Sequence, residues 1–329
     1  MRHIIQNYKH YPGYHCGSSG LRNLLSYCGC NISEDMVIGL GEAPSFYYFS
    51  DRSFDPVKII HTRFGFFEET FIKNTGLPFM IESGLENAES WLAVKDYIRV
   101  DIPVMARTDI FYLPYFDTKV HFNGHIVVVW GFDEENNEVY LSDTLRPEAQ
   151  TVSITDLILA SASETPPYMK KNIIFTINKR INKSDIDIVR VAISAIRSWG
   201  ERHIMSGVGI QSLKNLREDL PAWEDVESRS WCERFAYQQI EKRGTGGAAF
   251  RMPYLGFLEE LRAYIKDASL DEVIGLFSKN VKVWHRLAAL FKEKSEGNLK
   301  DYLEITRVLE NIIELESKAA EVCRNFKRR

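Results

Sequence analysis

Tyr11-Pro-Gly-Tyr-His-Cys-Gly-Ser-Ser-Gly-Leu-Arg-Asn-Leu-Leu25 is the stretch that decides the fold, because it places a cysteine between a turn and a helix. Pro-Gly favours a turn, small residues follow, and the leucines recur at the spacing of one helix face. The thiolate is the reactive form of cysteine, and the unpaired N–H groups and positive dipole end of a helix N-terminus favour it. Cys16 is therefore a candidate nucleophile, although a small cysteine packed at a helix cap would have the same sequence.

Residues 122–144 offer partners for this thiol. A nucleophile needs a base, and the base needs an acceptor that orients it. The pattern predicts a β-hairpin with strands over 126–132 and 139–142 around a polar turn. His125 opens the first strand and Asp143 closes the second, so the two should lie within about 5 Å of each other. Such a carboxylate can hold an imidazole in one tautomer. Alternatively, His125 caps a buried strand and Asp143 begins a turn.

Composition narrows the class of protein. The chain has 329 residues, enough for one large domain or two ordinary ones. Lys and Arg number 41 and Asp and Glu 45, so the net charge is −4 and we expect no binding to nucleic acid or to an anionic membrane. The first ten residues lack a signal-peptide core, and no run of about 18 apolar residues follows. The five cysteines show neither disulfide-framework nor zinc-site spacing. We therefore expect a cytoplasmic protein without a bound metal.

The predicted secondary structure changes from mixed strands and helices to helices alone near residue 180. Before it, short apolar runs predict strands over 46–49, 57–62, 78–82, 103–108, 125–132, 138–143 and 172–177. Helices are predicted between them over 17–27, 34–40, 67–74, 88–100 and 155–162. Beyond it, amphipathic helices are predicted over 185–204, 223–243, 253–266, 270–294 and 299–323. These patterns predict an α+β domain over residues 1–178 and an all-α domain over 184–329.

The helix-capping Cys16, the strand-opening His125 and the strand-closing Asp143 together resemble the papain-like cysteine-protease superfamily. Within it, residues 14–25, with 32–41 and Phe46-Tyr-Tyr-Phe49, resemble the N-terminal domain of the butirosin biosynthesis protein H-like family. The second half resembles the domain of unknown function that often follows that domain. Its marker is the sequence Arg243-Gly-Thr-Gly-Gly-Ala-Ala-Phe-Arg251, followed by residues 254–260.

This resemblance implies a papain-like first domain and an acyltransferase activity. The acyl group would pass from a carrier-protein or coenzyme A thioester to an amine of a small molecule, through an acyl-Cys16 intermediate. Cys16 matches the nucleophile of the family, His125 the base and Asp143 the orienting acid. No permanently bound cofactor is expected, and phosphopantetheine would enter only as the donor thioester. The residues leave two alternatives open: a cysteine peptidase or amidase of this fold, and a non-catalytic binding protein.

The oxyanion hole departs from the papain-like pattern. Many such enzymes place a glutamine about six residues before the nucleophile, where it donates to the oxyanion. His10 stands at that position here, and the nearest glutamine is Gln6. We expect the backbone N–H of Cys16 to donate, together with His10, Gln6 or Tyr14.

Several residues are candidates for substrate binding. His15 adjoins the cysteine and either caps the helix or lies at the rim of a cleft. Tyr112 and Tyr115 belong to an aromatic segment that either forms a substrate wall or packs as a loop. His121 lies in the loop before the hairpin. It precedes His125 by four residues, but no helix is predicted there and no third ligand is evident, so the pair does not indicate a metal.

The glycine-rich run after Arg243 is the last candidate. It follows a predicted helix rather than a strand, so it is neither a P-loop nor a dinucleotide fingerprint. A glycine just after a helix is a common C-cap. Alternatively, exposed N–H groups between Arg243 and Arg251 could hold a phosphate, such as that of phosphopantetheine. The residues of the run are Gly244, Thr245, Gly246 and Gly247.

Overall fold

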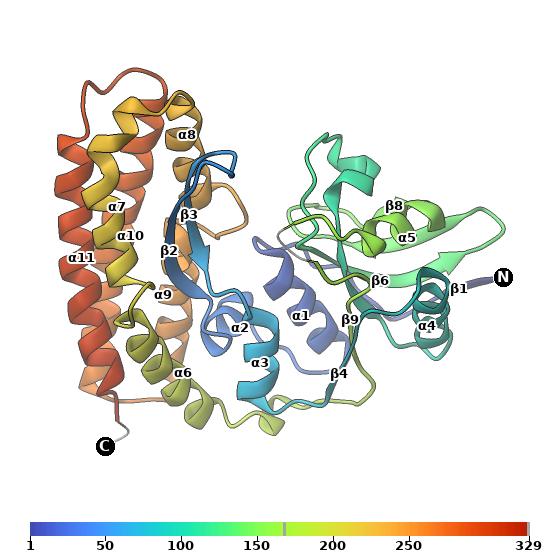
Figure 1. Ribbon diagram of the computed structural model, residues 1–329. Helices are drawn as coiled ribbons and strands as arrows, with labels where there is room; N and C mark the ends of the chain where they lie inside the picture. The colour runs from blue at the N-terminus through green and yellow to red at the C-terminus, as the bar shows by residue number, and fades with distance from the viewer. Residues whose placement is uncertain (167–168, 328–329) are drawn as a thin grey trace. The chain divides into compact units, whose positions relative to one another are not determined.

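The computed structural model describes residues 1–166 and 169–327. The chain divides into two compact units (Figure 1). Unit 1 comprises residues 1–37 and 76–186, and unit 2 comprises residues 38–75 and 187–329. Within the described residues, no helix combines the length and the apolar character needed to cross a membrane.

Unit 1 is built on a seven-stranded sheet whose paired strands are all antiparallel. The order is β4–β9–β5–β6–β7–β8, and β1 pairs with β6. The strands are β1 (Arg2–Ile4), β4 (Phe79–Glu82), β5 (Val104–Thr108), β6 (His125–Asp133), β7 (Glu138–Ser142), β8 (Gln150–Val152) and β9 (Ile174–Ile177). The helices are α1 (Cys16–Tyr27), α4 (Asn87–Arg99) and α5 (Ile154–Ala162), while α2 (Glu34–Leu40) crosses the boundary between the units.

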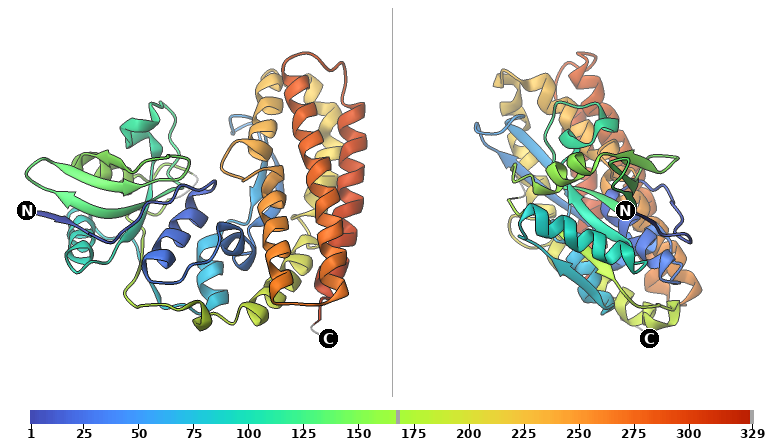
Figure 2. Two further views of the ribbon diagram at one scale, coloured as in Figure 1. Left: turned by 180° about the vertical axis from the view of Figure 1, so that it is seen from behind. Right: turned by 90° about the vertical axis from the view of Figure 1, so that its right-hand side faces the viewer.

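The centre of unit 1 is the contact between α1 and strands β5 and β6 (Figures 1 and 2). Strand β6 is buried along nearly its whole length, as its run of β-branched residues predicts. Gly20 lets α1 approach closely, since a Cβ there would lie 3.0 Å from Ile126 and 3.1 Å from the sulfur of Met105. Because Ile126 follows the first residue of β6, this contact brings the N-terminal turn of α1 to the start of the strand.

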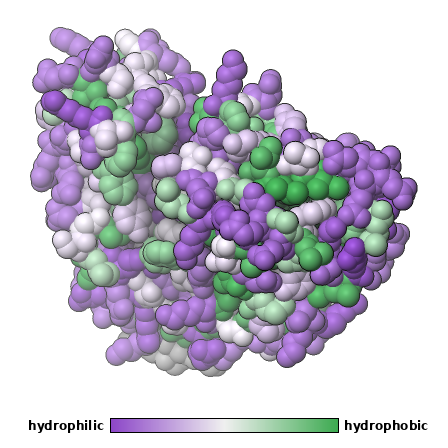
Figure 3. All heavy atoms as spheres, turned by 45° about the vertical axis from the view of Figure 1, so that its right-hand side comes forward, coloured by the Kyte–Doolittle hydropathy of each residue, from purple (hydrophilic) through white to green (hydrophobic). Residues whose placement is uncertain are grey.

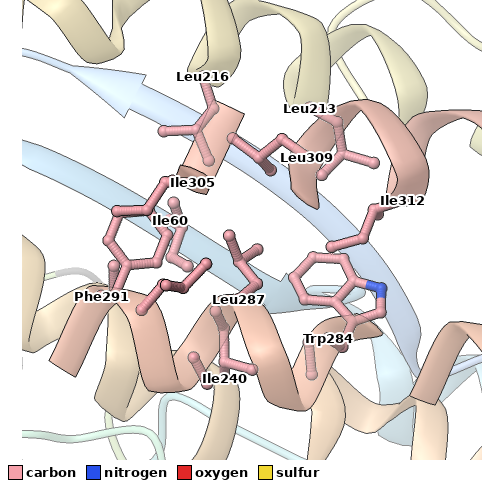
Figure 4. Packing of buried hydrophobic residues seen from close by; sticks show 14 of the residues in the cluster. Ile60, Leu213, Leu216, Ile240, Trp284, Leu287, Phe291, Ile305, Leu309 and Ile312 are labelled. Atoms are coloured by element: carbon pink, nitrogen blue, oxygen red, sulfur yellow. The ribbon is translucent and has the colours of Figure 1, made fainter. Parts of the chain in front are cut away.

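Unit 2 packs helices around a two-stranded sheet. Its elements are β2 (Pro44–Ser50), β3 (Lys58–Arg63), α3 (Phe67–Thr75), α6 (Ile188–His203), α7 (Ile210–Asp219), α8 (Arg229–Glu241), α9 (Arg251–Glu260), α10 (Ala268–Ser295) and α11 (Leu303–Arg324). Trp284, Leu287 and Phe291 of α10 meet Leu309 and Ile312 of α11 in its core (Figure 4). The region after residue 184 is helical, as predicted.

The segment 38–75 lies in unit 2, whereas its β-rich pattern led us to expect it in the first domain. Strand β3 alternates buried Ile60 and Thr62 with partly exposed Ile59 and His61. Its buried face packs on α8, and Ile60 joins the helical core (Figure 4). The alternation of residues along a strand shows which face is buried, but not which helix or sheet packs against that face.

Three elements were not predicted. Strands β1 and β8 have three residues each, too few to show an alternating pattern. Helix α7 begins at Ile210, between the helices predicted over 185–204 and 223–243. Gly207 and Gly209 directly precede this helix and both have positive φ. On the face seen in Figure 3, most side chains are polar with apolar ones between them, as is usual for globular domains.

Candidate active site

Cys16 is the first residue of α1, and its side chain is partly exposed. His15 is the N-cap, with an extended backbone, and its Nδ1 accepts a hydrogen bond of 3.1 Å from the N–H of Ser18. Within the described residues, the N–H of Cys16 has no acceptor, as expected in the first turn of a helix. The other cysteines are buried: Cys28, Cys30, Cys232 and Cys323. Cys16 is thus the thiol that a substrate can reach.

Glu34, the buried first residue of α2, holds the turn that precedes Cys16. Its carboxylate accepts hydrogen bonds from the N–H groups of Tyr14 at 3.3 Å and His15 at 3.0 Å, and from the hydroxyl of Ser18 at 2.8 Å. Burial is the largest influence on this carboxyl and raises the pKa of Glu34, although these donors and Arg22 act in the opposite direction. Sequence reasoning missed Glu34, because nothing local marks a glutamate 16 to 20 residues away as a partner of Tyr14, His15 and Ser18.

Substituting Gly13 should test how tightly the turn is packed. A Cβ there would lie 2.4 Å from Oε2 of Glu34 and 2.5 Å from Cβ of Ser19. We expect Gly13→Ala to lower the free energy of unfolding by about 1–3 kcal/mol, as overpacking does. Urea denaturation would measure the change, with Gly65→Ala as the matched control, since a Cβ at Gly65 meets nothing within 4 Å. Equal midpoints for the two variants would contradict the described packing.

His125 and Asp143 meet across the β6–β7 hairpin. Nε2 of His125 lies 2.8 Å from Oδ1 of Asp143. The strands pair Val128 with Ser142, so Asp143 follows directly after β7 while His125 begins β6. The two residues are only 6% and 2% exposed. A buried carboxylate at this nitrogen fixes both the tautomer and the orientation of the imidazole.

Cys16 interacts with the His125–Asp143 pair and influences the pKa of His125. Burial, the largest influence on His125, disfavours the imidazolium. The Asp143 carboxylate and Cys16, each through charge and hydrogen bonding, outweigh burial and raise the pKa of His125 to about 10. Because Nε2 is bonded to Asp143, Nδ1 is the ring nitrogen left to face the thiol. The arrangement can therefore hold a thiolate beside an imidazolium.

The raised pKa of His125 predicts a pH dependence of stability. The ordinary value for histidine is about 6.5, and the folded value is about 10. The folded protein thus binds the proton more tightly, so this contribution is complete below about pH 6.5 and is lost as the pH rises to about 10. We expect the wild type to lose free energy of unfolding between pH 7 and 10 relative to His125→Gln. Urea denaturation at several pH values measures this, and a difference that does not vary with pH would contradict it.

Residues of two loops cover the His125–Asp143 pair. The hydroxyl of Tyr115 donates to Oδ2 of Asp143 at 2.6 Å. The ring of Phe116 stands edge-on to the imidazole, with 5.0 Å between the ring centres. The guanidinium of Arg146 lies 5.2 Å and 5.1 Å from the ring centres of Tyr115 and Phe116. The sequence left open whether Tyr115 forms a substrate wall or packs in a loop, and sequence reasoning missed Phe116 and Arg146.

The three candidates for the second oxyanion donor all have partners elsewhere. The two ring nitrogens of His10 lie 2.8 Å from the hydroxyl of Ser142 and 2.9 Å from the carbonyl of Arg146. Gln6 donates to the carbonyl of Ile4, and the hydroxyl of Tyr14 donates to Asp35. These bonds engage the ring of His10 and the hydroxyl of Tyr14, whereas the Gln6 amide keeps a second N–H.

The candidates for substrate binding in unit 1 are dispersed. His15 is buried and caps the helix, the first of the two places that the sequence left open for it. His121 is bonded through Nδ1 to Asp109 at 2.8 Å, and its side chain is 37% exposed. Tyr112 packs edge-on against the same imidazole. Within residues 1–166 and 169–327, no group of three His, Cys, Asp or Glu side chains could hold a metal ion.

The glycine-rich run belongs to unit 2 and forms an internally bonded turn. Gly244, Gly246 and Gly247 have positive φ, and the hydroxyl of Thr245 donates to the carbonyl of Ile240. The guanidinium of Arg243 bonds Gln238, and that of Arg251 is fully buried against Glu316. Arg251 is thus not available to a phosphate, and the C-cap of α8 is Lys242, which precedes the run.

Comparison with known families adds to this geometry. The family described as butirosin biosynthesis protein H, N-terminal, matches residues 15–144. A domain of unknown function (DUF4872) matches residues 155–322. A search of curated proteins returned no match. The two matches follow each other in the order of the N-terminal and C-terminal domains of one family and together span most of the chain, which therefore belongs to the butirosin biosynthesis protein H-like family.

Proposed function

We propose that the protein is a cysteine-dependent acyltransferase that moves an acyl group from a carrier-protein or coenzyme A thioester to an amine of a small molecule. The observation that carries the proposal is the meeting of a partly exposed cysteine at a helix N-terminus with a buried His–Asp pair. A central helix that bears the nucleophile, packed on an antiparallel sheet that bears the base, supports a papain-like fold for unit 1. The name of the matching family supports a role in secondary-metabolite biosynthesis.

The first half of the reaction acylates the enzyme. The Cys16 thiolate attacks the thioester carbonyl, and the N–H of Cys16 donates to the resulting oxyanion. The tetrahedral intermediate then collapses, and the carbon–sulfur bond of the donor breaks. The protonated His125 gives its proton to the departing thiolate, which leaves as a thiol. Acyl-Cys16 and a neutral imidazole remain.

The second half transfers the acyl group. An amine attacks acyl-Cys16, and His125 accepts the proton that the nitrogen loses. Collapse of the second intermediate forms an amide and restores the thiolate beside the imidazolium. The free energy changes little when the acyl group passes from one thioester to another. The net reaction is therefore driven by the later transfer of the acyl group to an amine or to water. Competition between these two acceptors distinguishes a transferase from a hydrolase.

Intact-mass spectrometry tests the proposal directly. The protein is incubated with acyl-coenzyme A and acyl-carrier-protein thioesters, the adduct is mapped by peptide analysis, and its decay is followed with and without primary amines. We expect an acyl group on Cys16 and faster release with an amine than in buffer. Equal release rates would assign a hydrolase, and the absence of any acyl-Cys16 would contradict the proposal.

A further inference from the structure

We propose that Tyr115 is a positioning residue, which acts on His125 by holding Asp143 and so extends the proposed triad by one member. This inference rests on the proposed function. The evidence for the role of Tyr115 is the pair of hydrogen bonds that Asp143 makes. One carboxylate oxygen, Oδ1, lies 2.8 Å from Nε2 of His125, and the other, Oδ2, accepts the Tyr115 hydroxyl at 2.6 Å.

Because Asp143 is buried, its hydrogen bond to Tyr115 matters for the orientation of the carboxylate. The residue is 2% exposed, so water does not replace a missing partner at Oδ2. A buried charged oxygen without a donor is costly, and the carboxylate would turn to find one. With both oxygens bonded, rotation about the Cβ–Cγ bond would break two contacts at once. The Tyr115 hydroxyl therefore fixes the plane in which Asp143 faces the imidazole.

Tyr115 remains a donor throughout the working pH range. Burial, and then the charge and hydrogen bond of Asp143, raise the pKa of Tyr115 far above its usual value. A phenol that stays protonated beside a carboxylate can only donate to it. The bond to Oδ2 thus persists whether or not His125 carries its second proton.

The surrounding loop sets the position of the Tyr115 hydroxyl. Tyr115 lies in a short 3₁₀ turn, Pro114–Phe116, which ends at Asp117 with a left-handed φ of 48°. Arg146 donates to the carbonyl of Tyr115 at 3.1 Å and lies over its ring. The ring of Phe116 meets the imidazole itself, so the turn contacts both members of the His–Asp pair.

Tyr112 provides the matched control. It lies one 3₁₀ turn earlier, in Ile110–Tyr112, and is partly buried as Tyr115 is. Its ring contacts Phe111 and His121, and within the described residues its hydroxyl makes no hydrogen bond to the protein. If the two tyrosines served only as a substrate wall, loss of either hydroxyl would leave the reactivity of Cys16 toward a small reagent unchanged.

The test compares Tyr115→Phe with Tyr112→Phe by the pH dependence of Cys16 alkylation with iodoacetamide. We expect Tyr115→Phe to slow alkylation at pH 7 about tenfold and to move the rising limb of the profile up by about one pH unit. Tyr112→Phe should stay within about twofold of the wild type.

A double variant tests whether Tyr115 acts through Asp143. In an Asp143→Asn background, Tyr115→Phe should slow alkylation by less than about a further twofold, because the two residues act as one unit. Tyr115 is half-buried on a surface turn, so loss of one oxygen should leave the fold intact, as circular dichroism would verify.

Three results would overturn the inference. A Tyr115→Phe profile equal to that of Tyr112→Phe, while His125→Ala abolishes the low-pH reactivity, would remove Tyr115 and leave the proposed function standing. A tenfold effect that persists in Asp143→Asn would show that Tyr115 does not act through the carboxylate. A wild-type thiol that titrates like free cysteine would remove the proposed function together with the inference.

Discussion

Replacing Cys16 by serine is expected to abolish the acyl-enzyme and to lower amine acylation by at least about 10⁴-fold. The serine hydroxyl stays protonated beside His125, so the thiolate–imidazolium pair no longer forms. The other four cysteines are buried and cannot replace the lost nucleophile. Acyl transfer to an amine, followed by mass spectrometry, measures the loss.

Cys30→Ala is the matched control for that substitution. Cys30 is fully buried in the same unit and makes no contact with the proposed pair in the described structure. This variant should keep acyl transfer within about threefold of the wild type once its folding is verified. Retention of more than a tenth of the activity by Cys16→Ser would contradict the assignment of Cys16 as the nucleophile.

The second large effect concerns the stability of unit 2, where Glu316 of α11 is fully buried. Its carboxylate accepts two hydrogen bonds from Arg251, at 2.9 Å and 3.0 Å, one from Asn280 at 2.9 Å and one from Trp284 at 2.7 Å. His203 of α6 pairs with the same group. Glu316→Ala should lower the free energy of unfolding by about 3–5 kcal/mol, because it leaves the buried guanidinium of Arg251 without its counter-charge.

Glu314→Ala is the control for this prediction. Glu314 lies two residues earlier on the same helix, is exposed, and pairs with Lys318. Its loss should leave the urea midpoint unchanged, because exposed ion pairs stabilise little. A similar shift for both variants, or none for Glu316→Ala, would contradict the structural role of the buried cluster.

The buried cluster also bears on the turn that follows the glycine-rich run of the second half. Ala248, Ala249 and Phe250 all have positive φ, which is unfavourable for residues with a Cβ. Arg251 follows them, and its guanidinium donates to the carbonyl of Ala249 at 2.7 Å. The ion pair with Glu316 therefore holds a strained turn in place. A phosphate would find the arginine already engaged.

Local patterns predicted much of the fold and of the site. The apolar run of β6 and the polar turn after it placed His125 opposite Asp143, and the structure gives 2.8 Å between them. The leucines after Gly20 predicted α1, which begins at Cys16. These features depend on residues close in sequence, for which periodicity and turn chemistry are informative.

The features that could not be predicted depend on contacts between distant residues. Glu34 reaches the turn before Cys16 from a different helix, and Tyr115 reaches Asp143 from 28 residues away. In both cases the residue type suits several roles, and only the tertiary contact selects one of them. For Arg251 the sequence left a phosphate site open, and a partner 65 residues away engages the guanidinium instead.

The pH dependence of Cys16 alkylation by iodoacetamide, in the wild type and in His125→Ala, tests the central claim most directly. Intact mass and peptide mapping would give the rate at Cys16 from about pH 5 to 9.5. The account predicts rapid labelling of the wild type well below pH 8 and a collapse of that labelling in His125→Ala. Slow labelling that rises near pH 8.5 in both proteins would show an ordinary thiol and contradict the thiolate–imidazolium pair.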